Sequence, residues 1–136
     1  MTRSRKAVLD ILVSAQEPRS ASDVFALMAG SADQATVYRT LHYLEENGFA
    51  ESFILHCTSH GTERFYTVSS SGAGEKEMHR HWFHCEDCHR FTDLGNCTLD
   101  DLVQGYETRH GIEVKTHTLY LTGVCASCLS LSQVNG

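Results

Sequence analysis

Two Cys-x-x-Cys pairs constrain the fold of this chain more than any other feature. The first pair is Cys85 and Cys88, the second is Cys125 and Cys128, and residues 89–124 separate them. Each pair can turn two thiolates toward one ion, and two pairs complete a tetrahedral zinc site with Zn–S distances of about 2.3 Å. The ion would join two distant segments and stabilise a domain whose core is small. The sequence therefore predicts a closed structural Zn²⁺ site.

Two other uses of paired cysteines fit the sequence less well. A redox dithiol of the thioredoxin type opens a helix in a βαβ unit, whereas each pair here follows a predicted strand. A zinc deaminase needs Pro-Cys-x-x-Cys with an upstream His-x-Glu, and the chain has neither. Cys57 and Cys97 have no partner at ligand spacing, so each is expected to be a small buried residue.

The charge pattern limits the kinds of partner that the chain can bind. The formal net charge is −6, and residues 1–50 carry five Lys/Arg against six Asp/Glu. A generally basic nucleic-acid binder is therefore excluded, and any DNA contact must come from a few well-placed cations. Charged residues near the start and the lack of a long apolar run predict a cytoplasmic protein without membrane contact. A reducing cytosol favours metal ligation over disulfides.

The first part of the chain has the apolar spacing of three short helices. Residues 5–15 form an apolar helical stripe, and Ser20 with Asp23 resembles a capping box that opens a second helix. A third helix is predicted over 34–47, with Asp33 as its N-cap. On this third helix the apolar residues turn inward and three polar residues turn outward. The outward residues are Thr36, Arg39 and Thr40.

A β-hairpin is predicted to follow these helices. Residues 49–55 alternate as a strand does, 56–63 have the composition of a turn, and 64–68 form the returning strand. Three helices followed by a hairpin describe a winged helix-turn-helix, in which the third helix enters the major groove of DNA. We therefore expect residues 1–68 to form a DNA-binding domain.

The remainder of the chain predicts a small α+β domain. Residues 69–78 are mostly polar or small and form a hinge or linker, and the second domain covers 79–136. It should contain two strands around the first cysteine pair, a helix near 98–111 and a long strand over 112–125. The side chains on the inward face of this helix should be Leu99, Leu102, Val103 and Tyr106. A domain this small needs a metal, a dimer partner, or both.

Several motifs together resemble the Fur (ferric uptake regulator) family of metal-responsive repressors. They are ATVYRTLHYLEENGF (35–49), HRH (79–81), CEDC (85–88), THTLYLTGVC (116–125) and CASC (125–128). The resemblance implies a winged helix, a hinge and a C-terminal α/β dimerisation domain. It also implies a homodimer that binds a palindromic operator in double-stranded DNA when its regulatory metal is bound. By the same resemblance, Tyr38 and Arg39 contact DNA, with Thr36 close enough to contribute.

The resemblance also implies a second, regulatory divalent metal. The positions that match the family's ligands are His79, His81, Asp100 and His117. Imidazoles with a carboxylate suit zinc, iron(II) or nickel.

The chain departs from the iron- and peroxide-sensing members at three positions. Pro18 or Arg19 stands where they supply a histidine, Thr67 replaces a carboxylate, and Trp82 replaces the last histidine before the first cysteine. The segments nearby instead offer Cys57, His60 and His84 as candidate hinge ligands. Because a thiolate favours Zn²⁺ over Fe²⁺, we expect the zinc-uptake regulator (Zur) branch, with an iron- or peroxide-responsive regulator as the alternative. His89 is expected to be a surface residue.

Two functions from other classes remain as hypotheses. A zinc hydrolase could hold water on the histidine cluster, with Asp100 or Glu113 as general base. No catalytic motif accompanies the histidines, and a winged helix would then have no role, so an enzyme is not expected. The other hypothesis is a zinc-dependent dimerisation module that does not bind DNA, which the acidic charge permits.

Overall fold

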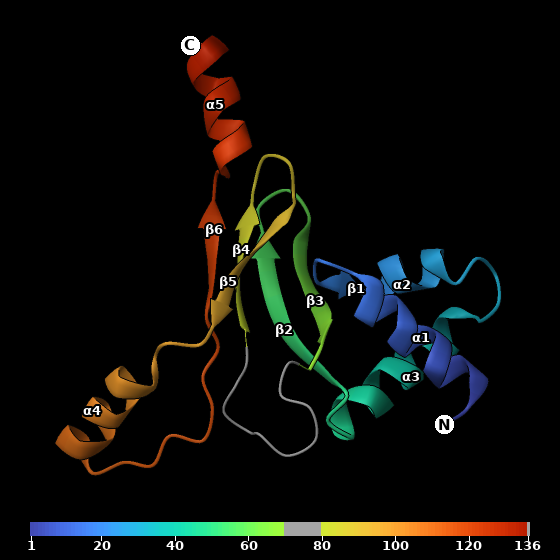
Figure 1. Cartoon of the computed structure of the whole chain (residues 1–136), viewed down its shortest axis with the longest axis horizontal. Coiled ribbons are helices and arrows are strands. Elements are labelled where there is room, and N and C mark those ends of the chain that lie inside the picture. The colour runs from blue at the N-terminus through green and yellow to red at the C-terminus, as the bar shows by residue number, and fades with distance from the viewer. Residues whose placement is uncertain (70–79, 136) are drawn as a thin grey trace.

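Two three-stranded sheets and the helices around them make up the fold (Figure 1). The computed structural model describes residues 1–69 and 80–135 of the chain. The linker predicted at 69–78 and His79 therefore lie outside the described residues, apart from residue 69. The division into domains at these positions stays a prediction. None of the described helices is long and apolar enough to span a bilayer.

The three helices predicted in the first part are confirmed. They are α1 (Arg3–Ser14), α2 (Ala21–Leu27) and α3 (Gln34–Glu46). Ser20 and Asp23 form a reciprocal capping box on α2, and the Asp33 carboxylate accepts a hydrogen bond from the Thr36 amide at the start of α3. These contacts fix the helix starts, while an apolar stripe from each helix forms the core. Its most buried members include Val8, Leu12, Val24, Val37, Leu41 and Leu44.

The hairpin is longer than the sequence predicts. Strand β2 (Ala50–Cys57) pairs with β3 (Gly61–Val68) in an antiparallel ladder, and the two-residue β1 (Arg19–Ser20), which was not predicted, pairs with β3. The prediction of a turn over 56–63 is wrong in its length. Gly61 has a φ of 77°, a conformation that glycine adopts without strain, so the chain can reverse close to the strand ends. We call the β2–β3 hairpin the wing, and Cys57 is therefore a strand residue at its tip.

The second sheet has the order β5-β4-β6. Strands β4 (Arg80–Cys85) and β5 (Phe91–Asn96) are antiparallel, and β6 (Tyr120–Gly123) lies parallel to β4. The long strand predicted over 112–125 is wrong for most of its length, because only residues 120–123 pair with β4. Helix α5 (Ala126–Asn135) follows directly after Cys125.

Helix α4 (Asp100–His110) stands away from the sheets (Figure 1). It was predicted to turn Leu102 and Tyr106 inward, but these side chains are 50% and 43% exposed in the single chain. The prediction is wrong for this chain on its own, since no element of the same chain that the structure describes covers that face. Gly111 has a φ of 64° and ends the helix as predicted.

The wing packs against the second sheet through aromatic side chains. Phe53 and Phe65 of the wing lie next to Phe91 of β5, with ring centroids 6.2 Å and 5.0 Å from it. Phe53 also lies 6.3 Å from the ring of Tyr120 in β6, whose hydroxyl accepts a hydrogen bond from the His56 amide at 3.3 Å. The tip of the wing and the first cysteine pair are thereby brought to the same end of the molecule.

Candidate metal centres

Four thiols converge at the end of the second sheet. The sulfurs of Cys85, Cys88, Cys125 and Cys128 lie within 4.8 Å of one another, and those of Cys88 and Cys125 are 3.7 Å apart. A tetrahedron with Zn–S bonds of about 2.3 Å has S···S edges of about 3.8 Å. The thiols therefore have the spacing that a tetrahedral zinc ion requires. We call them the four-thiol centre.

The proton affinities of these thiols are uneven. Backbone amides of Cys88 and Cys125 each donate to the Cys85 sulfur at 3.4 Å, and these donors lower the pKa of Cys85 to about 6. The side-chain hydrogen bond with Cys125 raises the pKa of Cys128 to about 12. Thiolates gathered without a cation repel one another, so only some can ionise. A divalent cation would remove that repulsion and favour deprotonation of all four thiols.

The second cysteine pair is positioned by a helix start. Cys125 immediately precedes α5 and Cys128 lies in its first turn. The second pair therefore opens a helix, which was not predicted, but no described strand follows α5, so this helix is not part of a βαβ unit. The convergence of both pairs on one point also argues against two separate redox dithiols, which would not need it. All six cysteines of the chain are free thiols.

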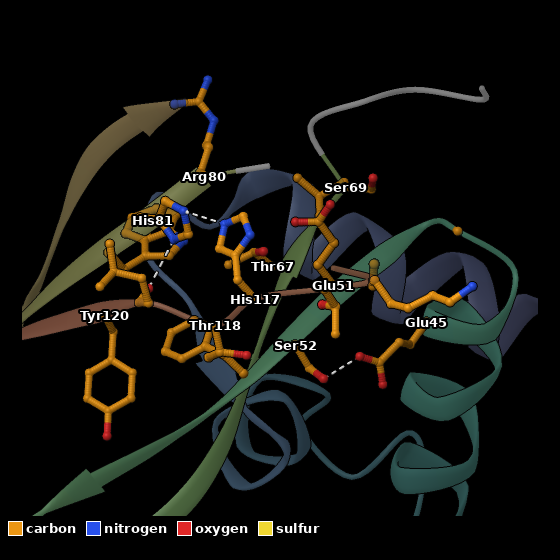
Figure 2. A pocket seen from close by; sticks show the side chains of 18 of the residues that line it. Glu45, Glu51, Ser52, Thr67, Ser69, Arg80, His81, His117, Thr118 and Tyr120 are labelled. Carbon is orange, nitrogen blue, oxygen red and sulfur yellow. Dashed lines mark hydrogen bonds between the residues drawn. The ribbon is translucent and has the colours of Figure 1, made fainter. Parts of the chain in front are cut away.

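A second group lies between β4, β5 and the segment before β6. His81 and His117 point toward one another, with their Nε2 atoms 3.4 Å apart (Figure 2). The sulfur of Cys97 lies 3.3 Å from His117 Nε2. In a tetrahedral zinc site the N···N edge is about 3.3 Å and the N···S edge about 3.6 Å, so the three atoms can share one ion. We call Cys97, His81 and His117 the His81 centre.

The contact of His81 with a backbone carbonyl leaves its other ring nitrogen able to bind a metal ion. Its Nδ1 lies 3.0 Å from the carbonyl oxygen of Leu119, so the proton belongs on Nδ1 and the Nε2 lone pair faces His117. A carbonyl acceptor on the second ring nitrogen is the arrangement that metal-bound histidines usually have.

The structure brings together only some of the residues that the sequence predicted for the regulatory site. His81 and His117 meet, whereas Asp100 lines the same cavity of about 1360 Å³ but lies outside the close group of donors. Cys97 was expected to be a lone buried thiol and instead joins the two histidines. Glu51 of the wing also lines this cavity, and burial raises the pKa of its carboxyl.

The candidate hinge ligands do not join the His81 centre. Cys57 and His84 instead form a third group with His89, whose donor atoms lie within 4.8 Å of one another. The ring of His60 lies 4.2 Å from that of His89. Burial, followed by the charge of His89, lowers the pKa of His84 and keeps its imidazole neutral at pH 7. His89, expected to be a surface residue, is half-buried in this group.

Helix α3 presents the side chains expected to contact DNA. Tyr38 is 58% exposed and Arg39 is exposed, with an Arg39 Nη2–Thr36 Oγ1 distance of 3.5 Å. Thr40 was expected to lean outward, but it is only 6% exposed and packs on the inner face beside Leu41. The outward face of α3 thus carries one cation and one aromatic ring that could reach a base or a phosphate.

Comparisons with known proteins agree on one family. Residues 1–122 match the model of the ferric uptake regulator family. The peroxide operon regulator of Bacillus subtilis is 28% identical over 131 residues, which cover 94% of this chain and 83% of that protein.

The fold also resembles solved structures of metal uptake regulators. A zinc uptake regulator complexed with zinc and DNA has a TM-score of 0.71 at 21% identity, covering 97% of this chain and 85% of that one. The Helicobacter pylori ferric uptake regulator has a TM-score of 0.69 at 17% identity, covering 95% and 81%.

Proposed function

The chain belongs to the ferric uptake regulator family, and we propose that it is a zinc-responsive repressor of metal-uptake genes. Members of this family are metal-responsive transcriptional regulators and not enzymes, with an N-terminal DNA-binding domain and a C-terminal dimerisation domain. The family therefore argues against the zinc hydrolase considered from the histidine cluster. The metal, the operator and the dimer of this particular chain are the parts that we propose.

The observation that carries the proposal is the donor set of the His81 centre. A thiolate with two imidazoles suits zinc better than iron(II), because sulfur is a soft ligand and iron(II) sensors rely more on oxygen and nitrogen. The donor spacing of 3.3–3.4 Å supports one tetrahedral ion. The zinc uptake regulator with a similar fold was solved with zinc and DNA, whereas the Bacillus subtilis relative is a peroxide regulator. An iron- or peroxide-responsive regulator is therefore the alternative.

The four-thiol centre has a separate, structural role in this proposal. Cys85 belongs to β4, Cys88 lies in the turn after it, and the second pair lies where β6 gives way to α5. Zinc held by these thiolates would clip the last strand and helix to the first strand of the sheet. A centre with four protein ligands leaves no open position, so it suits permanent retention of the ion rather than sensing.

Metal sensing would act by changing how the N-terminal part, which contains α3 and the β2–β3 hairpin, is arranged relative to the second sheet. The cavity of the His81 centre is lined by Glu51 and Ser52 of β2 as well as by residues of the second sheet. Drawing Cys97, His81 and His117 together would order this boundary and favour one orientation of the recognition helix α3. A coupling free energy of about 1–3 kcal/mol would raise DNA affinity about 5- to 150-fold.

The proposed partner is a second copy of the chain bound to double-stranded DNA. The exposed apolar face of α4, including Leu102 and Tyr106, and the exposed Leu121 of β6 support a dimer that buries them. A symmetric dimer would present two copies of α3, each with Tyr38 and Arg39 outward, to the half-sites of a palindromic operator.

A metal titration of DNA binding tests this function. The purified chain, with the four-thiol centre loaded, is mixed with labelled DNA from upstream of its own gene. Zinc, iron(II), nickel and manganese are then added separately. We expect zinc to promote binding at the lowest free concentration. Promotion by iron(II) alone would favour the alternative, and no promotion by any metal would contradict a metal-dependent repressor.

A further inference from the structure

A third group of metal-ligating side chains bridges the wing and the second sheet. Cys57 is the last residue of β2, His84 lies in β4, and His89 follows the first cysteine pair. Figure 1 shows the β2–β3 turn and the β4–β5 turn at the same end of the molecule, and the Cys57 sulfur lies 3.9 Å from Nδ1 of His89. We call Cys57, His84 and His89 the wing cluster.

The wing cluster is separate from the four-thiol centre even though the two are adjacent in sequence. Successive side chains of a strand point to opposite faces, so His84 turns toward the wing while Cys85 turns toward the other thiols. His89 has a φ of 63°, a left-handed conformation uncommon for a residue with a side chain. With that backbone conformation its ring lies beside those of His60 and His84, with centroids 4.2 Å and 5.5 Å away.

The cluster contains a polar atom without a partner. His84 is 3% exposed, and its Nδ1 has no hydrogen-bond partner among the residues that the structure describes. A buried nitrogen left in this state destabilises the folded chain, so such atoms are rare unless they serve a purpose. Cys57 is also 3% exposed, and both residues line a cavity of about 300 Å³ together with His60 and His89. One ring nitrogen of His84 lies within 4.8 Å of the other donors, so a bound cation would give this buried imidazole a polar partner.

The donor set selects the class of cation. One thiolate and two neutral imidazoles exclude magnesium and calcium, which prefer oxygen, and fit zinc. A tetrahedral zinc ion needs an N···S edge of about 3.6 Å, so the observed 3.9 Å closes with a shift of a few tenths of an ångström. The exposed His60 ring, or water, can fill the fourth position. Cys57 is the one thiol of the cluster, so a disulfide does not explain it.

We propose that Cys57, His84 and His89 form an interdomain zinc site that holds the tip of the wing against the second sheet. Cys57 comes from the hairpin, whereas His84 comes from β4 and His89 from the turn between β4 and β5, so the ion can bind only when the two parts are in contact. The site would therefore stabilise one orientation of the DNA-binding part. Zinc binding does not depend on the proposed function, whereas the consequence for DNA affinity rests on it.

Cobalt(II) gives a direct test of this site on the full chain. The four-thiol centre is kept loaded with zinc, and cobalt(II) is titrated into a Cys97→Ser variant, which lacks the thiol of the His81 centre. The remaining thiolate-to-cobalt charge-transfer band then belongs to Cys57. We expect this band to appear in Cys97→Ser and to be absent when Cys57→Ser is added. No band in Cys97→Ser, or a band that survives Cys57→Ser, would overturn the proposal.

A second variant guards against a simple folding defect. His89→Asn leaves the buried thiol intact, and asparagine tolerates the left-handed backbone at this position. In the Cys97→Ser background it should also abolish the band, while His42→Ala, on the exposed face of α3, should leave it unchanged. Zinc counting on the otherwise unaltered chain should give one ion fewer per chain for His89→Asn, and an unchanged count would overturn the proposal. These readouts need no DNA, so failure of the repressor proposal would not alter them.

Discussion

The sulfur of Cys97 lies 3.3 Å from Nε2 of His117, across a gap of twenty positions in the chain. Cys97 supplies the one thiolate of the His81 centre. Replacing it should therefore weaken the binding of zinc more than the binding of iron(II). We expect Cys97→Ser to lower the zinc affinity of this centre by roughly tenfold or more, about 1.4 kcal/mol. Competition with a chromophoric chelator measures it. A variant of the neighbouring residue, Asn96→Ser, is the control. Equal zinc affinities of the two variants would show that Cys97 is not a ligand of this centre.

The four-thiol centre should determine whether the second sheet folds. Structural zinc contributes about 10–16 kcal/mol of apparent binding free energy in small metal-dependent domains. Because this rivals the whole net stability of a domain, about 5–15 kcal/mol, loss of one thiolate should unfold this part. Cys128→Ser should therefore give a chain with a folded N-terminal part and a disordered second sheet, as measured by circular dichroism and protease digestion. An unchanged melting profile would show that these thiols have no structural role.

Arg39 should contribute to DNA binding without contributing to the fold. Its guanidinium is exposed on α3 beside Thr36. We expect Arg39→Ala to weaken operator binding by about 1–3 kcal/mol if the side chain reads a guanine. If the side chain contacts only a phosphate, the slope of log affinity against log salt concentration should instead decrease by about one. The control is His110→Ala on α4, away from the recognition helix, and equal DNA affinity of both variants would exclude Arg39 from the interface.

The Asp33 cap should make the stability of α3 depend on pH. Hydrogen bonds from the Thr36 side chain and amide lower the pKa of Asp33 below its ordinary value of 3.8. The ionised carboxylate therefore stabilises the folded state fully above pH 4, and this contribution is lost as pH falls through the lowered pKa. Asp33→Ala should lower the urea midpoint at pH 7, and its difference from the unaltered chain should shrink below pH 4. Asp33→Asn keeps an acceptor at the cap, so its urea midpoint should fall less than that of Asp33→Ala. A difference between Asp33→Ala and the unaltered chain that does not depend on pH would contradict this role.

Local features of the fold could be predicted, because each depends on neighbouring residues. The apolar spacing on α3 and the Ser20–Asp23 capping box are readable within a few positions. The inward face assigned to α4 was wrong because periodicity identifies an apolar face but not what covers it. Thr40 was likewise misplaced because it lies at the edge of an apolar stripe, where packing rather than polarity decides burial.

The proposed metal ligands differ in the same way, because some are indicated by their sequence spacing and others only by the folded arrangement. Two pairs of cysteines, each pair three positions apart, indicate ligands of a shared ion. The four-thiol centre could therefore be predicted from the spacing. Cys97 and His89 have no such spacing, and only the folded arrangement brings them to their partners. His89 gave a weak signal, since it directly follows Cys88 in a segment rich in histidines. For Cys97 the sequence offered no signal beyond its being an unpaired cysteine.

The most direct measurement is the zinc dependence of operator binding by a His117→Ala variant. Fluorescence anisotropy with labelled operator DNA is recorded against buffered free zinc, with His110→Ala of α4 as the control. His117→Ala should keep the four-thiol zinc and its oligomeric state, yet bind DNA only as weakly as the unaltered chain does at its lowest free zinc. His110→Ala should respond to zinc normally. A His117→Ala variant with an unaltered zinc response would contradict the assignment of the His81 centre as the regulatory site.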